Sequence, residues 1–234
     1  MTAQPDPRGD VAVLVPAAGI GARLGAGGPK ALRELAGVPL LVHAVRRVLA
    51  APSVATVVVA APVSSVDDVR AMLPPGVTVV PGGAVRQESV ALALAAVPEG
   101  YDIVLVHDAA RALAPPELCE QVAAAVRGGH PAVVPVLPVV DTIKEVGASG
   151  TVVGTVDRSV LRTVQTPQGF RRSVLVAAHA ARTSDPMTDD AALVEKLGVP
   201  VHTVPGDPLA LKITTPLDLE IAALMLRGRW GGGR

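Results

Sequence analysis

Hydrophobic residues along the chain follow two patterns, continuous apolar runs and stretches with helical spacing. The runs are short and bounded by glycine, proline or polar residues, which is typical of strands covered on both faces of a parallel sheet. Strands are expected at residues 11–15, 54–61, 77–80, 102–106 and 132–136, and helices between them at 39–50, 65–73, about 90–97 and 115–127. This alternation predicts an α/β fold with a doubly wound, mostly parallel, Rossmann-like sheet that binds ligands beyond the carboxyl ends of its strands.

The alternation breaks between about residues 137 and 165. Two short runs rich in Thr and Val, at 141–145 and 151–156, flank the turn Gly147-Ala148-Ser149-Gly150 and predict a projecting β-arm. A hairpin without a core of its own needs a surface to lie on. A second subunit of a homodimer is the expected surface, and a flap that folds over its own site is the alternative.

The pattern resumes after the arm. It predicts helices at 171–182 and 189–197, strands at 199–204 and 209–214, and a last helix that Thr215-Pro216 opens and Arg227 ends. Ser65 and Thr188 are expected to be N-caps. The polar ends, about 1–10 and 228–234, are expected to be disordered. No repeat or linker divides the chain, so a single domain over 1–234 is expected.

Composition limits the classes of function. Half of the residues are hydrophobic, and 21 basic residues balance 21 acidic ones, so a basic surface for nucleic acid is not expected. Cys119 is the single cysteine, which excludes an internal disulfide and a cysteine metal cluster. No apolar run approaches the length of a membrane span, and the amino-terminal residues do not form a signal peptide. A cytoplasmic protein that binds neither nucleic acid nor membrane is expected.

A glycine-rich loop follows the first strand, at residues 16–30. Small residues there allow backbone N–H groups to approach an anion, while Arg23 and Lys30 add charge for phosphate oxygens. The dinucleotide pattern G-x-G-x-x-G fails because Leu24 replaces the third glycine, and the P-loop pattern fails because Ala31 follows the lysine. A nucleoside-triphosphate site is predicted, with an ordinary surface loop as the alternative.

Three more polar clusters follow strands. They are Gly82-Gly83 with Arg86 and Ser89, then Asp108 with Arg111, and then Lys212-Ile213-Thr214-Thr215. Each cluster also has a non-functional interpretation, such as a local ion pair or an ordinary helix residue. His107 is expected to pack or hydrogen-bond beside the site. Arginines, lysines and one carboxylate, without a partnered nucleophile, favour phosphoryl or nucleotidyl transfer, in which positioning and charge neutralisation dominate. Asp108 is best placed to approach Mg²⁺ or another divalent cation.

Five motifs occur together in order: Pro16-Ala17-Ala18-Gly19-x-Gly21-x-Arg23 with Pro29-Lys30, Val106-His107-Asp108-Ala109-Ala110-Arg111, Asp141-Thr142-Ile143-Lys144, Thr166-Pro167-Gln168, and Leu211-Lys212-Ile213-Thr214. The ordered set, spread over about residues 11–227, closely resembles the 2-C-methyl-D-erythritol 4-phosphate cytidylyltransferase family of the non-mevalonate isoprenoid pathway. The resemblance implies a Mg²⁺-dependent reaction of CTP with methylerythritol phosphate, catalysed by a homodimer whose arm crosses to the other subunit.

The resemblance also implies roles for individual residues. The catalytic residues would be Arg23, Lys30 and Lys212; the nucleotide would be bound by Pro16, Ala17, Ala18, Gly19, Gly21, Gly82, Ser89 and Asp108; the acceptor would be bound by Arg111, Thr142, Arg158, Thr166 and Thr188; and Asp108 is the candidate metal ligand.

Alternatives from the same and other classes remain at this stage. A ribitol 5-phosphate cytidylyltransferase also takes a phosphorylated polyol, so phosphate binding does not distinguish the two acceptors. Residues near Arg111, Thr142 and Thr188 should decide between them, and one sequence does not show how. A non-catalytic nucleotide-binding module would be expected to lack Lys30, Asp108 or Lys212, all of which are present. A sugar-1-phosphate nucleotidyltransferase and a dinucleotide-dependent oxidoreductase fit the motifs less well.

Overall fold

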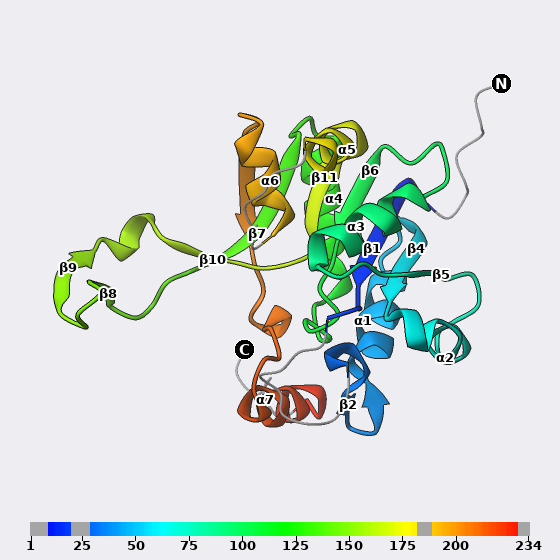
Figure 1. Ribbon diagram of the computed structural model, residues 1–234, viewed down its shortest axis with the longest axis horizontal. Helices are drawn as coiled ribbons and strands as arrows, with labels where there is room; N and C mark the ends of the chain where they lie inside the picture. The colour runs from blue at the N-terminus through cyan, green and yellow to red at the C-terminus, as the bar shows by residue number, and fades with distance from the viewer. Residues whose placement is uncertain (1–8, 20–28, 182–188, 229–234) are drawn as a thin grey trace.

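A computed structural model describes residues 9–19, 29–181 and 189–228. Its centre is an eight-stranded sheet in the order β10-β7-β11-β6-β1-β4-β5, with β12 paired to β7 (Figure 1). The strands of this sheet are β1 (Val11–Pro16), β4 (Val54–Ala61), β5 (Thr78–Pro81), β6 (Ile103–Val106), β7 (Ala132–Pro138), β10 (Arg162–Val164), β11 (Gln168–Arg171) and β12 (Val201–Pro205).

The predicted apolar strands form the parallel part of the sheet. Strand β1 lies between β4 and β6, parallel to both, and its five residues from Val11 to Val15 are fully buried. In the register of these strands Leu14 pairs with Val106, and Pro16 with Ala60. The loops that follow β1 and β6 therefore leave the sheet side by side, which brings two of the predicted polar clusters together.

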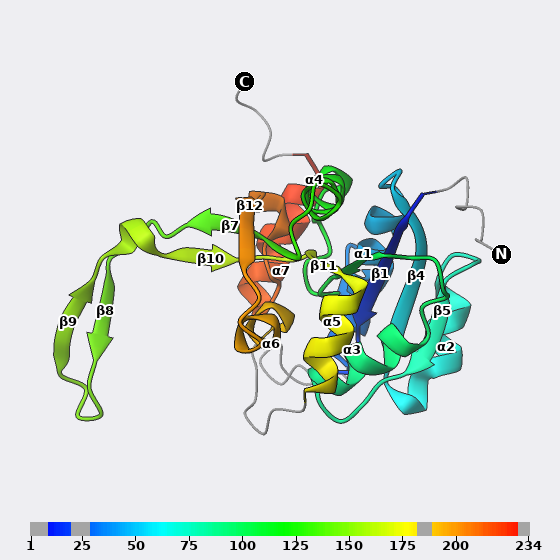
Figure 2. The same ribbon diagram turned by 90° about the horizontal axis from the view of Figure 1, so that it is seen from above.

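Helices cover both faces of the sheet, as the doubly wound prediction requires (Figure 2). One apolar layer contains residues of α1, α2 and α4, and the other contains residues of α3, α5 and α6. These helices are α1 (Leu40–Leu49), α2 (Val66–Met72), α3 (Arg86–Ala95), α4 (Pro116–Arg127), α5 (Arg172–Ala180) and α6 (Asp190–Lys196). The α/β fold predicted from the sequence is confirmed.

Within the central sheet, the antiparallel strands β10 and β11 were not predicted. Gln168–Arg171 forms β11, which runs antiparallel to both β6 and β7 and separates them. Gly169 makes this insertion possible, because a Cβ atom there would lie 2.5 Å from a methyl carbon of Val122 on the covering helix α4. The strand has only four residues and its apolar content is low, so hydrophobic patterning alone does not reveal it.

The last helix forms a separate small layer beside a hairpin. Helix α7 (Pro216–Leu226) begins with a capping box, in which Thr215 and Asp218 each accept from the other's backbone N–H. It packs near strands β2 (Glu34–Leu35) and β3 (Val38–Pro39), whose turn contains two residues with positive φ, Ala36 and Gly37. This short hairpin was also not predicted from the sequence.

Two local predictions were wrong, and a third, Ser65 as an N-cap, was right in position only. The expected strand at 209–214 is instead a 3-10 turn, Pro208–Ala210, followed by irregular chain, because the Asp207 side chain caps the turn by accepting from the Leu209 N–H. Ser65 does precede α2, but its side chain makes no capping hydrogen bond. Helix α6 is capped by Asp189, which accepts from Ala192 N at 3.0 Å, and not by Thr188, which lies outside the described residues.

The predicted arm is a two-stranded antiparallel sheet of its own, β8 (Ile143–Val146) with β9 (Val152–Val156). Figures 1 and 2 both show it extending away from the body of the molecule. Within one chain it is thus not a flap over the site. Val140, Val153 and Val160 are each more than half exposed along it, so the arm presents apolar surface that the described part of its own chain leaves uncovered.

The expected disorder of the two ends concerns residues that lie almost entirely outside the described ranges, and it stays a prediction. No helix within the described residues has the length and apolar character needed to cross a bilayer.

Candidate active site

A cleft opens at the carboxyl ends of β1, β5 and β6. It brings together four segments that are far apart in the sequence, and most of the residues predicted to bind nucleotide or to catalyse lie in it. Its lining includes Pro16, Ala17, Ala18, Gly19, Lys30, Arg86, Ser89, Asp108 and Lys212. The four predicted polar clusters therefore converge on one edge of the sheet, as expected for a doubly wound fold.

Small residues allow two loops to approach closely at one side of this cleft. A Cβ atom on Gly82 would lie 2.5 Å from the Cβ of Ala18 and 3.0 Å from the Oγ of Ser89. Ser89 is buried, accepts from the Gly83 N–H at 3.1 Å and donates to the Val85 carbonyl at 3.2 Å. The serine thus holds the turn before α3 in place, next to the loop that follows β1.

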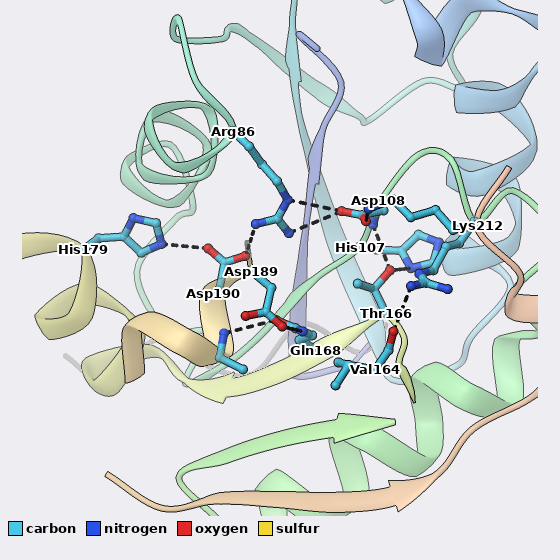
Figure 3. Close-up of polar contacts among 12 residues, drawn as sticks. Arg86, His107, Asp108, Val164, Thr166, Gln168, His179, Asp189, Asp190 and Lys212 are labelled. Carbon is cyan, nitrogen blue, oxygen red and sulfur yellow. Dashed lines mark hydrogen bonds and ion pairs between the residues drawn. The ribbon is translucent and has the colours of Figure 1, made fainter. Parts of the chain in front are cut away.

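Asp108 is the electrostatic centre of the cleft (Figure 3). Its Oδ2 lies 2.7 Å from the Lys212 Nζ, and its Oδ1 accepts from Nε and Nη2 of Arg86, each at 3.3 Å. Burial by itself raises the pKa of Asp108, but the charges of Arg86 and Lys212 outweigh burial and hold that pKa well below its usual value. The carboxylate is therefore ionised at neutral pH and anchors a lysine in the cleft.

Arg86 connects this centre to helices α5 and α6. Its Nη1 donates to Oδ2 of Asp190 at 2.7 Å, and Oδ1 of Asp190 lies 3.0 Å from Nε2 of His179. Burial lowers the pKa of Arg86, but Asp190 and Asp108 outweigh it and raise that pKa above its usual value. Asp190 is almost fully buried, so its charge needs these partners.

The sequence indicated Arg86 as part of a polar cluster but assigned it no role, and it gave no sign of Asp190 or His179. Arg86 and Asp190 are 104 positions apart in the chain. A carboxylate in the first turn of a helix is usually a solvated end of that helix. Only the fold shows that this one is buried against an arginine.

His107 and Thr166 form a second buried contact beside Asp108. Thr166 Oγ1 accepts from the Asp108 backbone N–H at 3.0 Å and lies 3.2 Å from Nδ1 of His107. Burial lowers the pKa of His107 to about 4, with a smaller contribution from the charge of Arg111. The imidazole is thus neutral at physiological pH, and the prediction that His107 hydrogen-bonds beside the site is confirmed.

A smaller pocket adjoins the cleft and shares Arg86, Asp108 and Lys212 with it. The remaining residues that line it are Arg111, Val164, Gln165, Thr166, Gln168 and Asp189. Two predicted acceptor-binding residues, Arg111 and Thr166, therefore lie next to the cleft that holds the predicted nucleotide-binding residues.

Arg111 does not pair with Asp108, which removes the simple ion-pair alternative. Its Nη1 donates to the Ala210 carbonyl at 2.6 Å and its Nη2 to the Val164 carbonyl at 3.0 Å. Burial lowers the pKa of Arg111, although Asp108 opposes this effect. The two carbonyls hold the guanidinium at the pocket wall in a fixed orientation.

Gln168 joins strand β11 to the start of α6 in the same pocket. Its Nε2 donates to Oδ2 of Asp189 at 2.7 Å, and its Oε1 accepts from the Ala191 N–H at 3.2 Å. The sequence placed Gln168 in a motif without giving it a function, and Asp189 was not singled out. The hydrogen bonds between Gln168 and residues 189 and 191 fix the start of α6, which directly follows Thr188 in the sequence.

Other predicted site residues are not brought to the cleft within one chain. Thr142 and Arg158 are exposed on the arm, where Arg158 donates to the Val140 carbonyl. Gly21, Arg23 and Thr188 lie outside the described residues, so their predicted roles stay predictions.

The donor set of the cleft is compatible with a divalent cation. Among the described residues no group of three or more His, Cys, Asp or Glu side chains could hold a metal. Mg²⁺ in nucleotide sites commonly takes one or two carboxylates, with phosphate oxygens and waters completing the octahedron. A single carboxylate that faces the cleft, Asp108, fits this pattern, so the metal would be held jointly with a bound triphosphate.

Comparisons with known proteins agree with the geometry. The family model described as 2-C-methyl-D-erythritol 4-phosphate cytidylyltransferase matches residues 11–228. A protein of that name from Nocardia farcinica is 55% identical over 227 residues, which cover 96% of this chain and 97% of the relative. One from Frankia casuarinae is 56% identical over 216 residues, covering 92% of this chain and 81% of the relative.

A solved structure extends the agreement to three dimensions. The crystal structure of 2-C-methyl-D-erythritol 4-phosphate cytidylyltransferase from Thermus thermophilus is 38% identical, with a TM-score of 0.77, and the match covers 93% of this chain and 99% of that one. The resemblance drawn from the five motifs is confirmed over nearly the whole sequence. This chain belongs to the 2-C-methyl-D-erythritol 4-phosphate cytidylyltransferase family.

Proposed function

We propose that this protein transfers the cytidylyl group of CTP to 2-C-methyl-D-erythritol 4-phosphate, giving 4-diphosphocytidyl-2-C-methyl-D-erythritol and pyrophosphate. The observation that carries the proposal is the pair of adjoining pockets, which share Asp108 and Lys212. A nucleotide in the cleft and an acceptor in the smaller pocket would meet at these two residues. Family membership favours this acceptor over ribitol 5-phosphate.

The cleft has separate regions for the parts of CTP. Ala17, Ala18, Gly82 and Ser89 offer small side chains and backbone groups, which suit a flat base and a ribose. Pro16, Gly19 and Gly21 belong to the loop assigned to the phosphates, together with Arg23 and Lys30. Backbone N–H groups of such a loop can approach phosphate oxygens closely.

The chemistry needs charge and alignment more than a base. An oxygen of the acceptor phosphate attacks the α-phosphorus of CTP, the bond from that phosphorus to the bridging oxygen breaks, and pyrophosphate leaves. The attacking phosphate is already ionised at neutral pH, so no general base is required. Lys30, Arg23 and Lys212 supply positive charge where negative charge grows in the transition state.

Asp108 serves two purposes in this proposal. Its ion pair with Lys212 fixes the lysine between the two pockets. It would also hold Mg²⁺, or another divalent cation, together with the phosphates of CTP. The metal supplies neutralisation of charge on the triphosphate.

The acceptor site is completed by a second subunit. Arg111, Thr166 and Thr188 come from one chain, while Thr142 and Arg158 come from the arm of its partner in a homodimer. The exposed valines of the arm support this arrangement, because a second copy would cover them. Because CTP is consumed, a cytoplasmic location is part of the proposal.

Mixing two impaired variants, assayed at an acceptor concentration well below the KM, tests the shared site. In a heterodimer of Lys30→Ala and Arg158→Ala chains, one site combines an intact body with an intact partner arm, and the other carries both lesions. Activity should therefore rise above that of either variant when the two are unfolded together and refolded as a mixture. A mixture no more active than the average of its components would show that the arm serves its own chain.

Nucleotide preference tests the assignment of the cleft. Pyrophosphate release with the methylerythritol acceptor and Mg²⁺ should be fastest with CTP and much slower with UTP, ATP or GTP. Equal rates with all four nucleotides would contradict a site built for cytosine.

A further inference from the structure

The hydroxyl of Thr166 has a defined set of hydrogen-bonding options. A threonine hydroxyl has one hydrogen to donate and two lone pairs that accept. One lone pair is occupied, since the backbone N–H of Asp108 donates to Oγ1 at 3.0 Å. The role of the remaining lone pair and of the hydrogen depends on the neighbouring imidazole.

That imidazole belongs to His107, which is fully buried (Figure 3). Its Nδ1 lies 3.2 Å from Thr166 Oγ1, while its Nε2 has no hydrogen-bond partner within the part of the chain that the structure describes. The backbones of Arg111 and Thr166 also act on the ring and partly oppose the lowering of the His107 pKa, but neither leaves Nε2 with a hydrogen-bond partner. A neutral ring carries its single N–H on one of these two nitrogens.

The two tautomers differ in what they leave unpaired. With the proton on Nε2, a buried N–H donor has no acceptor, and the threonine must donate its hydrogen to Nδ1. With the proton on Nδ1, the ring donates to Thr166 Oγ1, and only an acceptor lone pair on Nε2 lacks a partner. A buried donor without an acceptor is the rarer and costlier defect.

We propose that His107 is a positioning residue that, as the Nδ1–H tautomer, makes Thr166 a hydrogen-bond donor to the acceptor phosphate. Both lone pairs of Thr166 Oγ1 are then filled by His107 and by the Asp108 N–H. The hydroxyl hydrogen is then free for an acceptor in the pocket that Thr166 lines with Arg111 and Lys212. The inference rests on the proposed function for the identity of the acceptor, but not for the tautomer.

The consequence is a gain in selectivity for an anion. In the opposite tautomer Thr166 would present only a lone pair to the pocket, and a lone pair repels phosphate oxygens. In the proposed tautomer a neutral donor lines the same pocket as three cationic side chains, Arg86, Arg111 and Lys212. The pocket therefore orients a phosphate by a directed hydrogen bond in addition to charge.

The tautomer itself is measurable without catalysis. Long-range ¹H–¹⁵N correlation spectra of the ¹⁵N-histidine-labelled wild-type protein distinguish a protonated from a bare ring nitrogen, and a spectrum of His107→Asn assigns the signals. The inference predicts a protonated Nδ1 and a bare Nε2. A protonated Nε2 would overturn it, whether or not the protein proves to be a cytidylyltransferase.

Kinetics test the link to the acceptor. His107→Phe keeps a ring but removes both nitrogens, and should raise the KM for the methylerythritol acceptor by about tenfold, which corresponds to about 1.4 kcal/mol, with little change in the KM for CTP. His107→Asn keeps an N–H near the position of Nδ1 and should recover part of the loss. His130→Phe, at an exposed position, is the matched control and should behave as wild type.

A double-mutant cycle with Thr166→Val completes the test. If His107 acts through Thr166, adding His107→Phe to Thr166→Val should raise the acceptor KM no further. Independent, additive effects of the two substitutions would overturn the inference. It would also be overturned if His107→Phe lowered kcat and raised both KM values by similar factors. Absence of turnover in the wild type would count against the proposed function alone, because the NMR result remains readable.

Discussion

The buried, neutral imidazole of His107 predicts a specific dependence of stability on pH. The pKa of His107 is about 4 in the folded protein against 6.5 for the free side chain. As the pH falls below 6.5, His107 becomes protonated in the unfolded chain, whereas in the folded chain it stays neutral down to about pH 4. Stability that is fully present above pH 6.5 is therefore lost over this window, by up to about 1.4 kcal/mol per pH unit and about 3 kcal/mol in total.

Urea unfolding of the metal-free protein between about pH 7.5 and 4.5 measures this loss. The wild type and His107→Phe are compared at each pH, because the other histidines and the carboxylates titrate in both proteins. Between these two pH values the free energy of unfolding should fall by about 2 to 3 kcal/mol more for the wild type than for His107→Phe. Parallel curves for the two proteins would refute the reasoning. If His107→Phe is too unstable, His107→Asn provides the same comparison.

Four substitutions test other parts of the account. Gly82→Ala should raise the KM for CTP by about tenfold, because the new Cβ would lie 2.5 Å from that of Ala18; an unchanged KM would separate this turn from the nucleotide. Lys30→Ala should lower kcat by roughly 100-fold while CTP affinity in equilibrium binding falls much less; equal losses would contradict a transition-state role. Arg158→Ala should raise the acceptor KM by about tenfold or more, and steady-state kinetics that leave it unchanged would remove the arm from the site. Asp218→Ala should lower the free energy of unfolding by about 1 kcal/mol at neutral pH. The difference should vanish as the pH falls from 3.8 to about 2, because the pKa of Asp218 is lowered by hydrogen bonds that its carboxylate accepts from a hydroxyl and from backbone amides. A difference that stays constant down to acid pH would contradict this.

Patterning predicted the parallel part of the fold because burial on both faces leaves a clear signature. The run from Val11 to Val15 has no polar residue, and each of its side chains is buried. Strand β11 was not predicted, because its position depends on the close packing of Gly169 against Val122 of α4, and these residues are far apart in the sequence. The expected strand near Leu209 failed for a local reason, since Asp207 caps a 3-10 turn there.

The candidate site was predictable as far as its residues follow parallel strands. Lys30, Ser89 and Asp108 come after β1, β5 and β6, whose carboxyl ends meet at one cleft. Lys212 reaches the same cleft although the strand expected around it does not form. Asp190 was not predictable, because its partner Arg86 lies 104 positions away and no local pattern marks a helix-terminal carboxylate as buried.

The acceptor could not be read from single residues either. Both acceptors are phosphorylated polyols, and the residues near Arg111 that should distinguish them cannot be interpreted from one sequence. Family membership, and not the local motif, separates these possibilities. The proposed contribution of the arm cannot be seen within one chain either, since Arg158 would reach a site only in an assembly.

The most direct measurement is pyrophosphate release by the purified protein with CTP and Mg²⁺, with 2-C-methyl-D-erythritol 4-phosphate and ribitol 5-phosphate compared side by side. The account predicts a far higher kcat/KM for the methylerythritol acceptor, with pyrophosphate and the cytidine diphosphate product formed in equal amounts. Preferred turnover of ribitol 5-phosphate, or no turnover of either acceptor while CTP still binds, would contradict it.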